Sequence, residues 1–349
     1  MSQKHEATHH RAAPGVALLL SAVSIAAICS PAIARPRDGQ ILRSTPWPEL
    51  PGWDSLDQFT HDYFPRSVYE EARTQREFEV LDITYSSDGL PVKGMLIRPK
   101  NPGNRKWPAI IFNRGGTGDY ARIGNYGVPC SEENDTCLYL VDLYLLAKAG
   151  FVVMASDYRF HGPTGKRDEW GGADVNDVLN LVPALNSMES VDPERLYMLG
   201  QSRGGTMTYI ALKRGVPVKA AAVIAGLSDL GDPGEHFRNW FVKGNQWFDG
   251  AASVWPDYAH RADEYYRERS AVYWPERINA PVLILHSRTD RLVPVSQALR
   301  MAAALQEKNK VYSLHIYDGD GHSLPLHRDD RNREIVEWFN RFSGPPTAH

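Results

Sequence analysis

The chain has 349 residues, of which 42% are hydrophobic and 23% are charged, and its formal net charge at pH 7 is -3. Such a length is ordinary for a single large α/β domain, and the apolar content is enough to bury a full core. The small net charge and the lack of a Lys/Arg block argue against nucleic acid or an anionic membrane surface as the partner. A small molecule or short peptide of neutral or mixed charge fits better.

Residues 1–34 have the pattern of a secretory signal peptide. Basic residues and histidines are followed by the apolar run 16–28, which is short for a membrane span, and by Ala32-Ile33-Ala34, an Ala-x-Ala cleavage signature. We therefore expect a mature chain that starts near Arg35 and is periplasmic or secreted, with no membrane attachment after cleavage. Cys29 raises the alternative of a lipid anchor, which the bulky Ile28 before it disfavours.

Residues 35–77 predict an irregular N-terminal arm. This segment is rich in Pro, Trp and acidic residues, and Pro46-Trp47-Pro48 and Pro51-Gly52-Trp53 favour turns. A helix is expected at its end, near residues 67–75.

Residues 78–343 predict one catalytic domain of the α/β class. Residues 79–85 and 92–98 form the pattern of an antiparallel hairpin with Gly89 in its loop. Apolar strand patterns then alternate with helical patterns, which predicts a mostly parallel sheet with helices on both faces. The expected strands are 108–112, 151–155, 195–199, 218–225, 281–286 and 311–317, and the expected helices are 136–149, 173–188, 206–214, 295–308 and 331–342.

Two cysteines, Cys130 and Cys137, would remain after signal cleavage. In an oxidising compartment a short polar loop of this kind can close as a disulfide, and the alternative is two unrelated thiols. A zinc site is a poorer interpretation, because no second Cys or His pair lies at finger-like spacing.

The pentapeptide Gly200-Gln201-Ser202-Arg203-Gly204 has the pattern of a nucleophile elbow, a serine on a tight turn between a strand and a helix. Glycines two residues either side of Ser202 are needed because the strand and the helix come very close there. The same pentapeptide also occurs by chance in structural turns. The order of the later motifs favours the catalytic interpretation.

The long insertion 228–275 follows the helix after Ser202, and its aromatic residues include Trp240 and Trp247. An insertion that leaves the carboxyl edge of the sheet would overhang the site, so we expect a cap in which these two tryptophans contact substrate. The alternative, favoured for most of its aromatic residues, is that they form a small core of the insertion itself.

Asp290 and His322 each follow a later strand, so the chain order is serine, aspartate, histidine, which is that of an α/β-hydrolase triad. Open α/β sheets bind their ligands beyond these same strand ends. In such a triad His322 takes the proton of Ser202, and Asp290 holds the imidazole in the correct tautomer. The competing residues are less well placed. His286 and His315 lie within predicted strands, and His327 lies too far past a strand end. Asp318 and Asp320 lie on the same loop as His322.

The oxyanion formed in acyl transfer needs two hydrogen-bond donors. The backbone N–H groups of Gly115, after the first parallel strand, and of Arg203, directly after the nucleophile, are the expected pair. An ordinary glycine turn is the alternative for Gly115 and Gly116. The mechanism needs no cofactor, and the sequence has no phosphate-cradling loop, dinucleotide fingerprint or metal-ligand pair.

Three arginines follow predicted strands near the site. Their guanidinium groups could bind a substrate carboxylate. Arg114 is the candidate for substrate binding, and the other two are Arg159 and Arg203. The alternative is structural pairing with Asp157, Asp174 or Asp177.

From about residue 78 to residue 342 the chain resembles the catalytic domain of the prolyl oligopeptidase family of α/β-hydrolases. The resemblance rests on Ser202, Asp290 and His322 together with Asp88-Gly89, Asn113-Arg114-Gly115-Gly116, Asp157-Tyr158-Arg159, residues 191–195, Gly204-Gly205 and residues 280–294. In two respects the chain departs from the family. Fewer than 80 residues precede the hairpin, too few for the family's β-propeller and its peptide-anchoring glutamates. Asn113-Arg114 stands where the family commonly has a histidine.

This resemblance implies a serine peptidase that acts on short peptides through an acyl-enzyme. The same triad would serve a carboxylic esterase acting on acylated sugars or aryl esters. A non-catalytic binding protein with a hydrolase fold is a third interpretation.

Overall fold

The computed structural model describes residues 35–47, 50–56, 58–116, 139–160, 166–232, 238, 241–244 and 249–344. Contacts divide the chain into the units Met1–Arg35 and Pro36–His349, and the fold described below belongs to the second unit. Within the described part, no helix has the length and apolar character needed to cross a membrane. The predicted signal peptide and the cysteines Cys130 and Cys137 lie outside the described residues.

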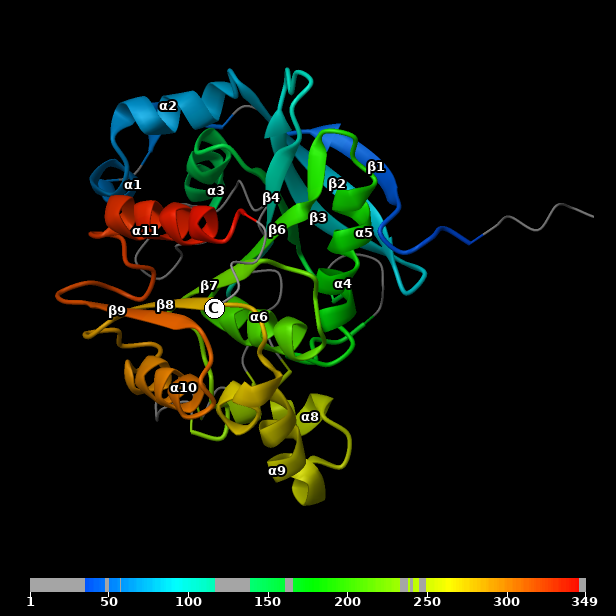
Figure 1. The fold of residues 1–349 in the computed structure, drawn as a ribbon, viewed down its shortest axis with the longest axis vertical. Coiled ribbons are helices and arrows are strands. Elements are labelled where there is room, and N and C mark those ends of the chain that lie inside the picture. The colour runs from blue at the N-terminus through cyan, green and yellow to red at the C-terminus, as the bar shows by residue number, and fades with distance from the viewer. Residues whose placement is uncertain are drawn as a thin grey trace, which may run out of the picture. The chain divides into compact units, whose positions relative to one another are not determined.

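In the described part of the chain, nine strands form one sheet in the order β1-β2-β3-β5-β4-β6-β7-β8-β9 (Figure 1). The first three strands, β1 (Ile41–Pro46), β2 (Phe78–Ser87) and β3 (Leu90–Pro99), pair antiparallel with their neighbours. The other pairings are all parallel. The parallel strands are β4 (Trp107–Asn113), β5 (Val152–Ser156), β6 (Val191–Gln201), β7 (Ala220–Ile224), β8 (Val282–Ser287) and β9 (Tyr312–Tyr317). The predicted α/β class with a mostly parallel sheet is confirmed.

Helices cover both faces of this sheet. In the strands, successive side chains point to opposite faces, so that Ile110 and Phe112 enter one hydrophobic cluster and Ala109 and Ile111 enter another. On the first face lie α2 (Arg66–Thr74), α3 (Tyr139–Lys148) and α11 (Arg328–Arg341); on the second lie α4 (Val175–Leu179), α5 (Leu181–Asn186), α6 (Arg203–Lys213) and α10 (Ser296–Glu307).

The N-terminal arm is more regular than its sequence indicates. Besides η1 (Trp53–Ser55) and α1 (Gln58–Tyr63), it contains β1, which pairs with β2 at the edge of the sheet. The side chains of β1 are mostly exposed. Its sequence therefore has no apolar alternation, and backbone pairing stabilises it. The prediction of an irregular arm is wrong for this segment.

The expected helix 173–188 is divided into α4 and α5, which meet at Asn180. Pro183 has no N–H with which to bond the carbonyl of Leu179, four residues earlier, and its ring crowds that carbonyl. The hairpin between β2 and β3 is also tighter than expected. Its two-residue turn, Asp88-Gly89, has φ of 52° and 75°, which suits the right-handed twist of the strands.

The insertion between β7 and β8 builds a small core of its own. Its described part includes α8 (Ala251–Val254), α9 (Tyr258–Arg269), η4 (Ala271–Tyr273) and η5 (Pro275–Arg277), and α8 and α9 lie at the bottom of the view in Figure 1. Phe241, Trp255 and Tyr265 pack there with Trp170 and Val293 in a third hydrophobic cluster.

Candidate active site

Ser202 lies on a strained turn between β6 and α6. Its φ of 56° and ψ of −123° place it in a region that side-chain-bearing residues rarely adopt. A Cβ added at Gly204 would fall on the carbonyl oxygen of Asn113, and one at Gly200 would fall on the carbonyl oxygen of Gly204. The geometry of the predicted elbow is therefore present, and the two glycines are required by close backbone contacts.

Gly115 lies directly beside Ser202. A Cβ built on Gly115 would be 3.0 Å from the Cβ of Ser202 and 2.9 Å from the Oη of Tyr139. The backbone N–H of Gly115 donates a hydrogen bond to this Oη, at 3.2 Å. The first predicted oxyanion donor thus lies next to the predicted nucleophile. The contact with Tyr139 had no signal in the sequence, because α3 begins far from both residues along the chain.

Asp290 and His322, from the loops after β8 and β9, meet in space. The Nδ1 of His322 is 2.7 Å from the Oδ2 of Asp290. The Oδ1 of Asp290 accepts hydrogen bonds from the backbone N–H groups of Leu292 and Val293, at 2.8 and 2.9 Å. The carboxylate of Asp290 is fully buried, whereas 13% of the side chain of His322 is exposed. A fixed carboxylate thus orients a partly accessible imidazole.

The environment of Asp290 keeps its carboxylate charged. Burial alone would raise the pKa of Asp290, but the positive charge of His322 and hydrogen bonds from His286, His322 and the backbone of Val293 hold that pKa well below its ordinary value. The carboxylate is therefore ionised throughout the pH range in which a histidine titrates.

A buried hydrogen bond connects the elbow to the histidine loop. The Nε2 of Gln201 donates to the Oγ of Ser323, at 2.6 Å. Gln201 precedes Ser202 and Ser323 follows His322, so this contact brings the two loops together at the carboxyl ends of β6 and β9. Nothing in the sequence predicted it, since Gln201 occupies a variable position of the pentapeptide.

Two of the competing histidines, His286 and His315, have contacts of their own. His286 is buried behind Asp290, with its Nε2 2.8 Å from the carbonyl oxygen of Val293 and 3.4 Å from the Oδ2 of Asp290. The Nδ1 of His315 is 2.5 Å from the Oε2 of Glu334. His286 is thus nearer to the candidate site than expected, as a support for the aspartate loop.

The competing aspartates hold loops in place. Asp320 accepts hydrogen bonds from the backbone N–H groups of Gly321, Leu326 and His327 and contacts the ring of His327 at 2.8 Å. Asp318 is exposed and pairs with Arg288. Both contacts agree with the turn role expected for these residues.

Arg114 is fully buried. Its Nη1 donates to the carbonyl oxygen of Gly115 at 2.9 Å, and its Nη2 donates to that of Asp157 at 3.0 Å. The guanidinium also lies over the ring of Tyr158. With no exposed surface it cannot reach a substrate, which corrects the expectation that Arg114 contacts substrate and favours the structural alternative.

Arg159 and Arg203 also pair with buried carboxylates. Arg159 contacts Asp177 through its Nε and Nη2, the latter at 2.8 Å. Arg203 contacts Asp168 at 2.5 and 2.6 Å and Asp174 at 2.9 Å. Of these partners, Asp168 was not anticipated from the sequence.

The two tryptophans expected to contact substrate, Trp240 and Trp247, lie outside the described residues. Most aromatic residues of the insertion that the structure does describe pack in the third cluster, namely Phe241, Trp255, Tyr258, Tyr265 and Tyr266. Trp274 packs in the second cluster, and Tyr273 is exposed. The residues of the third cluster follow the alternative interpretation of a small core.

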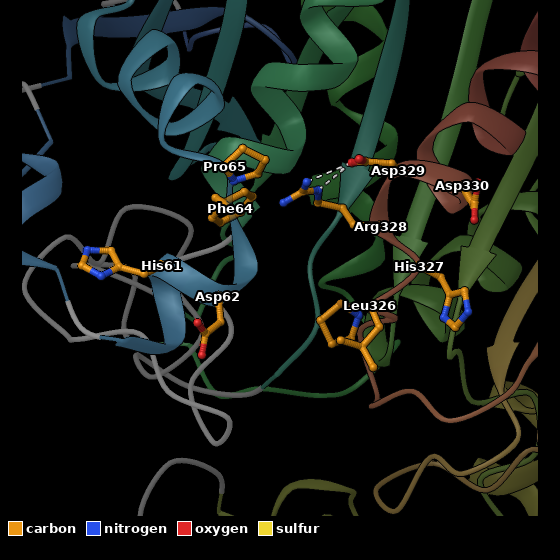
Figure 2. A pocket seen from close by; sticks show the side chains of 10 residues that line it. His61, Asp62, Phe64, Pro65, Leu326, His327, Arg328, Asp329 and Asp330 are labelled. Carbon is orange, nitrogen blue, oxygen red and sulfur yellow. Dashed lines mark hydrogen bonds and ion pairs between the residues drawn. The ribbon is translucent and has the colours of Figure 1, made fainter.

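A pocket of about 590 Å³ lies between the N-terminal arm and the loop after His322 (Figure 2). Figure 2 shows His61 and Asp62 on one side of it and Leu326 and His327 on the other. The full lining is His61, Asp62, Phe64, Pro65, Pro325, Leu326, His327, Arg328, Asp329 and Asp330. The arm therefore borders the loop that carries the predicted base.

Comparison with known proteins gives a consistent result. A model of the prolyl oligopeptidase family matches residues 139–345. The chain is 26% identical over 280 residues to the uncharacterised peptidase YuxL of Bacillus subtilis and 25% identical over 259 residues to the uncharacterised peptidase YtmA of the same organism. Each match covers 74% of this chain, but 38% of YuxL and 91% of YtmA.

Among solved structures, a puromycin-hydrolysing peptidase of Mycobacterium tuberculosis is 26% identical, with a TM-score of 0.56. The match covers 74% of this chain and 38% of that one. The chain thus spans well under half the length of two of these three proteins. The family match over residues 139–345 includes Ser202, Asp290 and His322.

Proposed function

Since the chain belongs to the prolyl oligopeptidase family, we propose that it is a serine peptidase that cleaves short peptides through an acyl-enzyme formed on Ser202. The family match supports a serine hydrolase acting on peptides. The observation that carries the finer assignment is the 2.7 Å contact between His322 and Asp290, at the same sheet edge as the strained Ser202.

The roles follow from the chemistry of each group. His322 accepts the proton of the Ser202 hydroxyl as the oxygen attacks the substrate carbonyl carbon. When the tetrahedral intermediate collapses, the imidazolium donates this proton to the leaving amine, and the acyl group stays on Ser202. A water molecule then attacks the ester, with His322 again acting as base. Asp290 orients the imidazole and stabilises its charged form.

The negative charge on the tetrahedral oxygen is stabilised by two backbone N–H groups. One belongs to Arg203 at the start of α6, where the helix dipole also favours an anion. The other belongs to Gly115, whose N–H donates to the Oη of Tyr139 at 3.2 Å. The oxyanion takes over this donor when substrate is bound.

Two observations support short peptides as substrates. The match to YtmA, an uncharacterised peptidase of which the chain spans 91%, supports peptides as substrates. The pocket beside the histidine loop, about 590 Å³, is within the range of small-ligand sites.

We also propose that the enzyme acts outside the cytoplasm. The basic, apolar and Ala-x-Ala segments of residues 1–34 support export with cleavage near Arg35. N-terminal sequencing of the protein recovered from culture medium or periplasm tests this, and a chain that retains its first 34 residues would contradict it.

The test of the activity compares amide and ester substrates that share one acyl group. A peptidase turns over both, while turnover of the ester alone would favour the carboxylic esterase interpretation. Ser202→Ala should lower turnover by about 10⁶-fold, because a serine nucleophile removed from a comparable triad costs about that much. A fluorophosphonate should label the parent at Ser202 and leave the variant unlabelled. Turnover that persists in the variant would show that the elbow is not the nucleophile.

A further inference from the structure

Arg203 has a side chain whose contacts the proposed mechanism does not use. Only 1% of this side chain is exposed. Its Nη1 and Nη2 donate to the two carboxylate oxygens of Asp168 at 2.5 and 2.6 Å, and Nη2 also donates to Asp174 at 2.9 Å. A two-pronged pairing of this kind fixes the plane of the guanidinium as well as its position.

The same guanidinium reaches the loop after β4. Its Nη1 donates to the carbonyl oxygen of Gly116, at 3.3 Å. The preceding carbonyl, that of Gly115, accepts a hydrogen bond from the Nη1 of Arg114. Two buried arginines thus hold two successive carbonyls of the loop whose N–H is the proposed oxyanion donor. The N–H of Gly115 lies in the peptide plane of the Arg114 carbonyl, which accepts a hydrogen bond from the Oη of Tyr158 at 3.1 Å. The guanidinium of Arg203 lies over the ring of Tyr158, 4.9 Å from its centroid. Arg203 therefore contacts both the residue that holds this plane and the carbonyl of Gly116 that follows it.

The carboxylates are themselves fixed by backbone. The Oδ1 of Asp168 accepts from the N–H of Trp170 at 3.1 Å, and Asp174 accepts from the N–H of Gly171 at 3.1 Å. Asp168 is 7% exposed and Asp174 is fully buried. The segment 168–174 is therefore a rigid support on which the guanidinium of Arg203 rests.

We propose that Asp168 is a positioning residue of the oxyanion hole, which acts through the side chain of Arg203 to hold the N–H groups of Arg203 and Gly115 toward the same point beside Ser202. This inference rests on the proposed function, because it assumes that the two N–H groups stabilise a substrate oxyanion. Stabilisation of that kind depends on donors that are already oriented before the charge develops.

The positioning role makes a specific kinetic prediction for Asp168→Asn. Arg203 keeps Asp174 as a partner in this variant, so the guanidinium is not left unpaired. Removing an oxyanion donor outright costs about 10²- to 10³-fold in kcat, and a loosened pair of donors should cost about tenfold. We expect kcat for p-nitrophenyl butyrate to fall about tenfold while KM changes less than about twofold, because ground-state binding does not use the oxyanion.

A transition-state analogue separates this effect from a general loss of structure. Phenylethylboronic acid forms a tetrahedral adduct with the serine oxygen and places a boron-bound oxygen in the oxyanion hole. Its Ki should rise by about the factor by which kcat falls, so the ratio of Ki to KM should increase about tenfold. A merely structural role would leave this ratio at the parent value.

Asp177→Asn is the matched control. Asp177 is a buried aspartate that pairs with an arginine, Arg159, and it has no hydrogen bond to Gly115, Gly116 or Arg203 among the described contacts. Burial raises the pKa of Asp177 to about 6, as it does for Asp168. We expect its loss to lower stability and to leave the ratio of Ki to KM unchanged.

Arg203→Lys provides a second test if Asp168→Asn does not fold. It keeps the backbone N–H and the positive charge but loses the planar fork, so the ratio of Ki to KM should again rise.

A folded Asp168→Asn protein with the parent ratio of Ki to KM would overturn the proposal, as would failure of both variants to fold. Activity that survives Ser202→Ala would instead refute the proposed function, so the two failures are distinguishable.

Discussion

The two sides of Ser202 are built in different ways. On the side proposed for proton transfer, Asp290 and His322 lie on loops after β8 and β9 and meet through one contact of 2.7 Å. On the side proposed for the oxyanion, the N–H groups of Gly115 and Arg203 belong to backbone that buried arginines and carboxylates hold in place. A base must exchange protons with substrate, whereas an oxyanion donor must keep one direction throughout the reaction.

On the two sides, the pKa of a buried aspartate is also shifted in opposite directions. The pKa of Asp290 is held below its ordinary value because His322 and several hydrogen bonds outweigh the effect of burial. The pKa of Asp168 is raised to about 6, mainly by burial and further by the neighbouring carboxylate of Asp174, although Arg203 opposes both. Proximity to a positive charge therefore does not decide the sign of the pKa shift alone, because burial, together with a neighbouring carboxylate, outweighs it at Asp168.

Among the substitutions that test this comparison, Asp290→Asn should lower kcat the most. Without the carboxylate, His322 adopts the wrong tautomer, and comparable triads then lose about 10⁴-fold in kcat. The exposed Asp318, which pairs with Arg288, offers a matched control, and Asp318→Asn should stay within about twofold of the parent. Steady-state turnover of both variants measures the difference. Near-normal rates for Asp290→Asn would move the role to Asp318 or Asp320.

Gly115→Ala should have the next largest effect. The added Cβ would lie 3.0 Å from the Cβ of Ser202 and 3.2 Å from the carbonyl oxygen of Gln201, so the loop must move and its N–H must turn. Losing this donor should lower kcat by about 10²- to 10³-fold. Gly52→Ala, where a Cβ has no neighbour within 4 Å, is the control for the substitution itself. A folded Gly115→Ala protein with parent activity would show that the loop does not supply the donor.

The sequence predicted Ser202, Asp290 and His322 better than it predicted the residues that hold them in place. The elbow, the aspartate and the histidine follow strands whose apolar runs are clear, so their common edge could be predicted from chain order. Tyr139, Ser323 and Asp168 are far from Ser202 in sequence and carry no motif, so their contacts emerge only when the loops are folded. Arg114 was misassigned because a strand-end arginine looks the same in sequence whether it faces solvent or a buried carbonyl.

In the fold, too, some elements could be predicted from the sequence and others could not. The parallel strands could be predicted because most of them are buried and have continuous apolar sequences, as in β5 and β8. Strand β1 was missed because its side chains are mostly exposed and its stabilisation comes from backbone pairing with β2. The break between α4 and α5 was missed although Pro183 marks it.

The opposite pKa shifts predict opposite pH dependences of stability. Asp290, with its lowered pKa, contributes stability above about pH 4 that is lost as pH falls. Asp168, with a pKa raised to about 6, contributes stability below about pH 4 that is lost as pH rises through 6. The charged groups facing Asp168 are Arg203, Asp174 and Arg114.

Urea unfolding of the two asparagine variants measures these contributions. Relative to the parent, Asp168→Asn should gain about 3 kcal/mol in unfolding free energy between pH 4 and pH 7, which is the value of a shift of about two pKa units. Asp290→Asn should lose unfolding free energy, relative to the parent, between pH 3 and pH 7. Two variants that change in the same direction would contradict the assignment of opposite shifts.

The smallest effect on turnover is expected from Trp255→Ala, although its effect on stability is large. Trp255 is 2% exposed, packs against Phe241 and Tyr265, and donates through its Nε1 to the carbonyl oxygen of Glu169 at 2.9 Å. Removing a buried tryptophan should lower the unfolding free energy by about 3 to 5 kcal/mol. The exposed Tyr273 provides the control, and Tyr273→Ala should change stability little.

Turnover by folded Trp255→Ala should stay within about threefold of the parent. Glu169 is next to Asp168, but the carboxylate of Asp168 is held by Arg203 and by the N–H of Trp170, and not by Trp255. The insertion then stabilises the fold without orienting the oxyanion donors. A fall in kcat with unchanged KM, and a boronic acid Ki that rises with it, would show instead that the oxyanion side depends on the insertion. Kinetics at a temperature well below the unfolding transition of both proteins separates these outcomes, because a stability effect disappears there and a positioning effect remains.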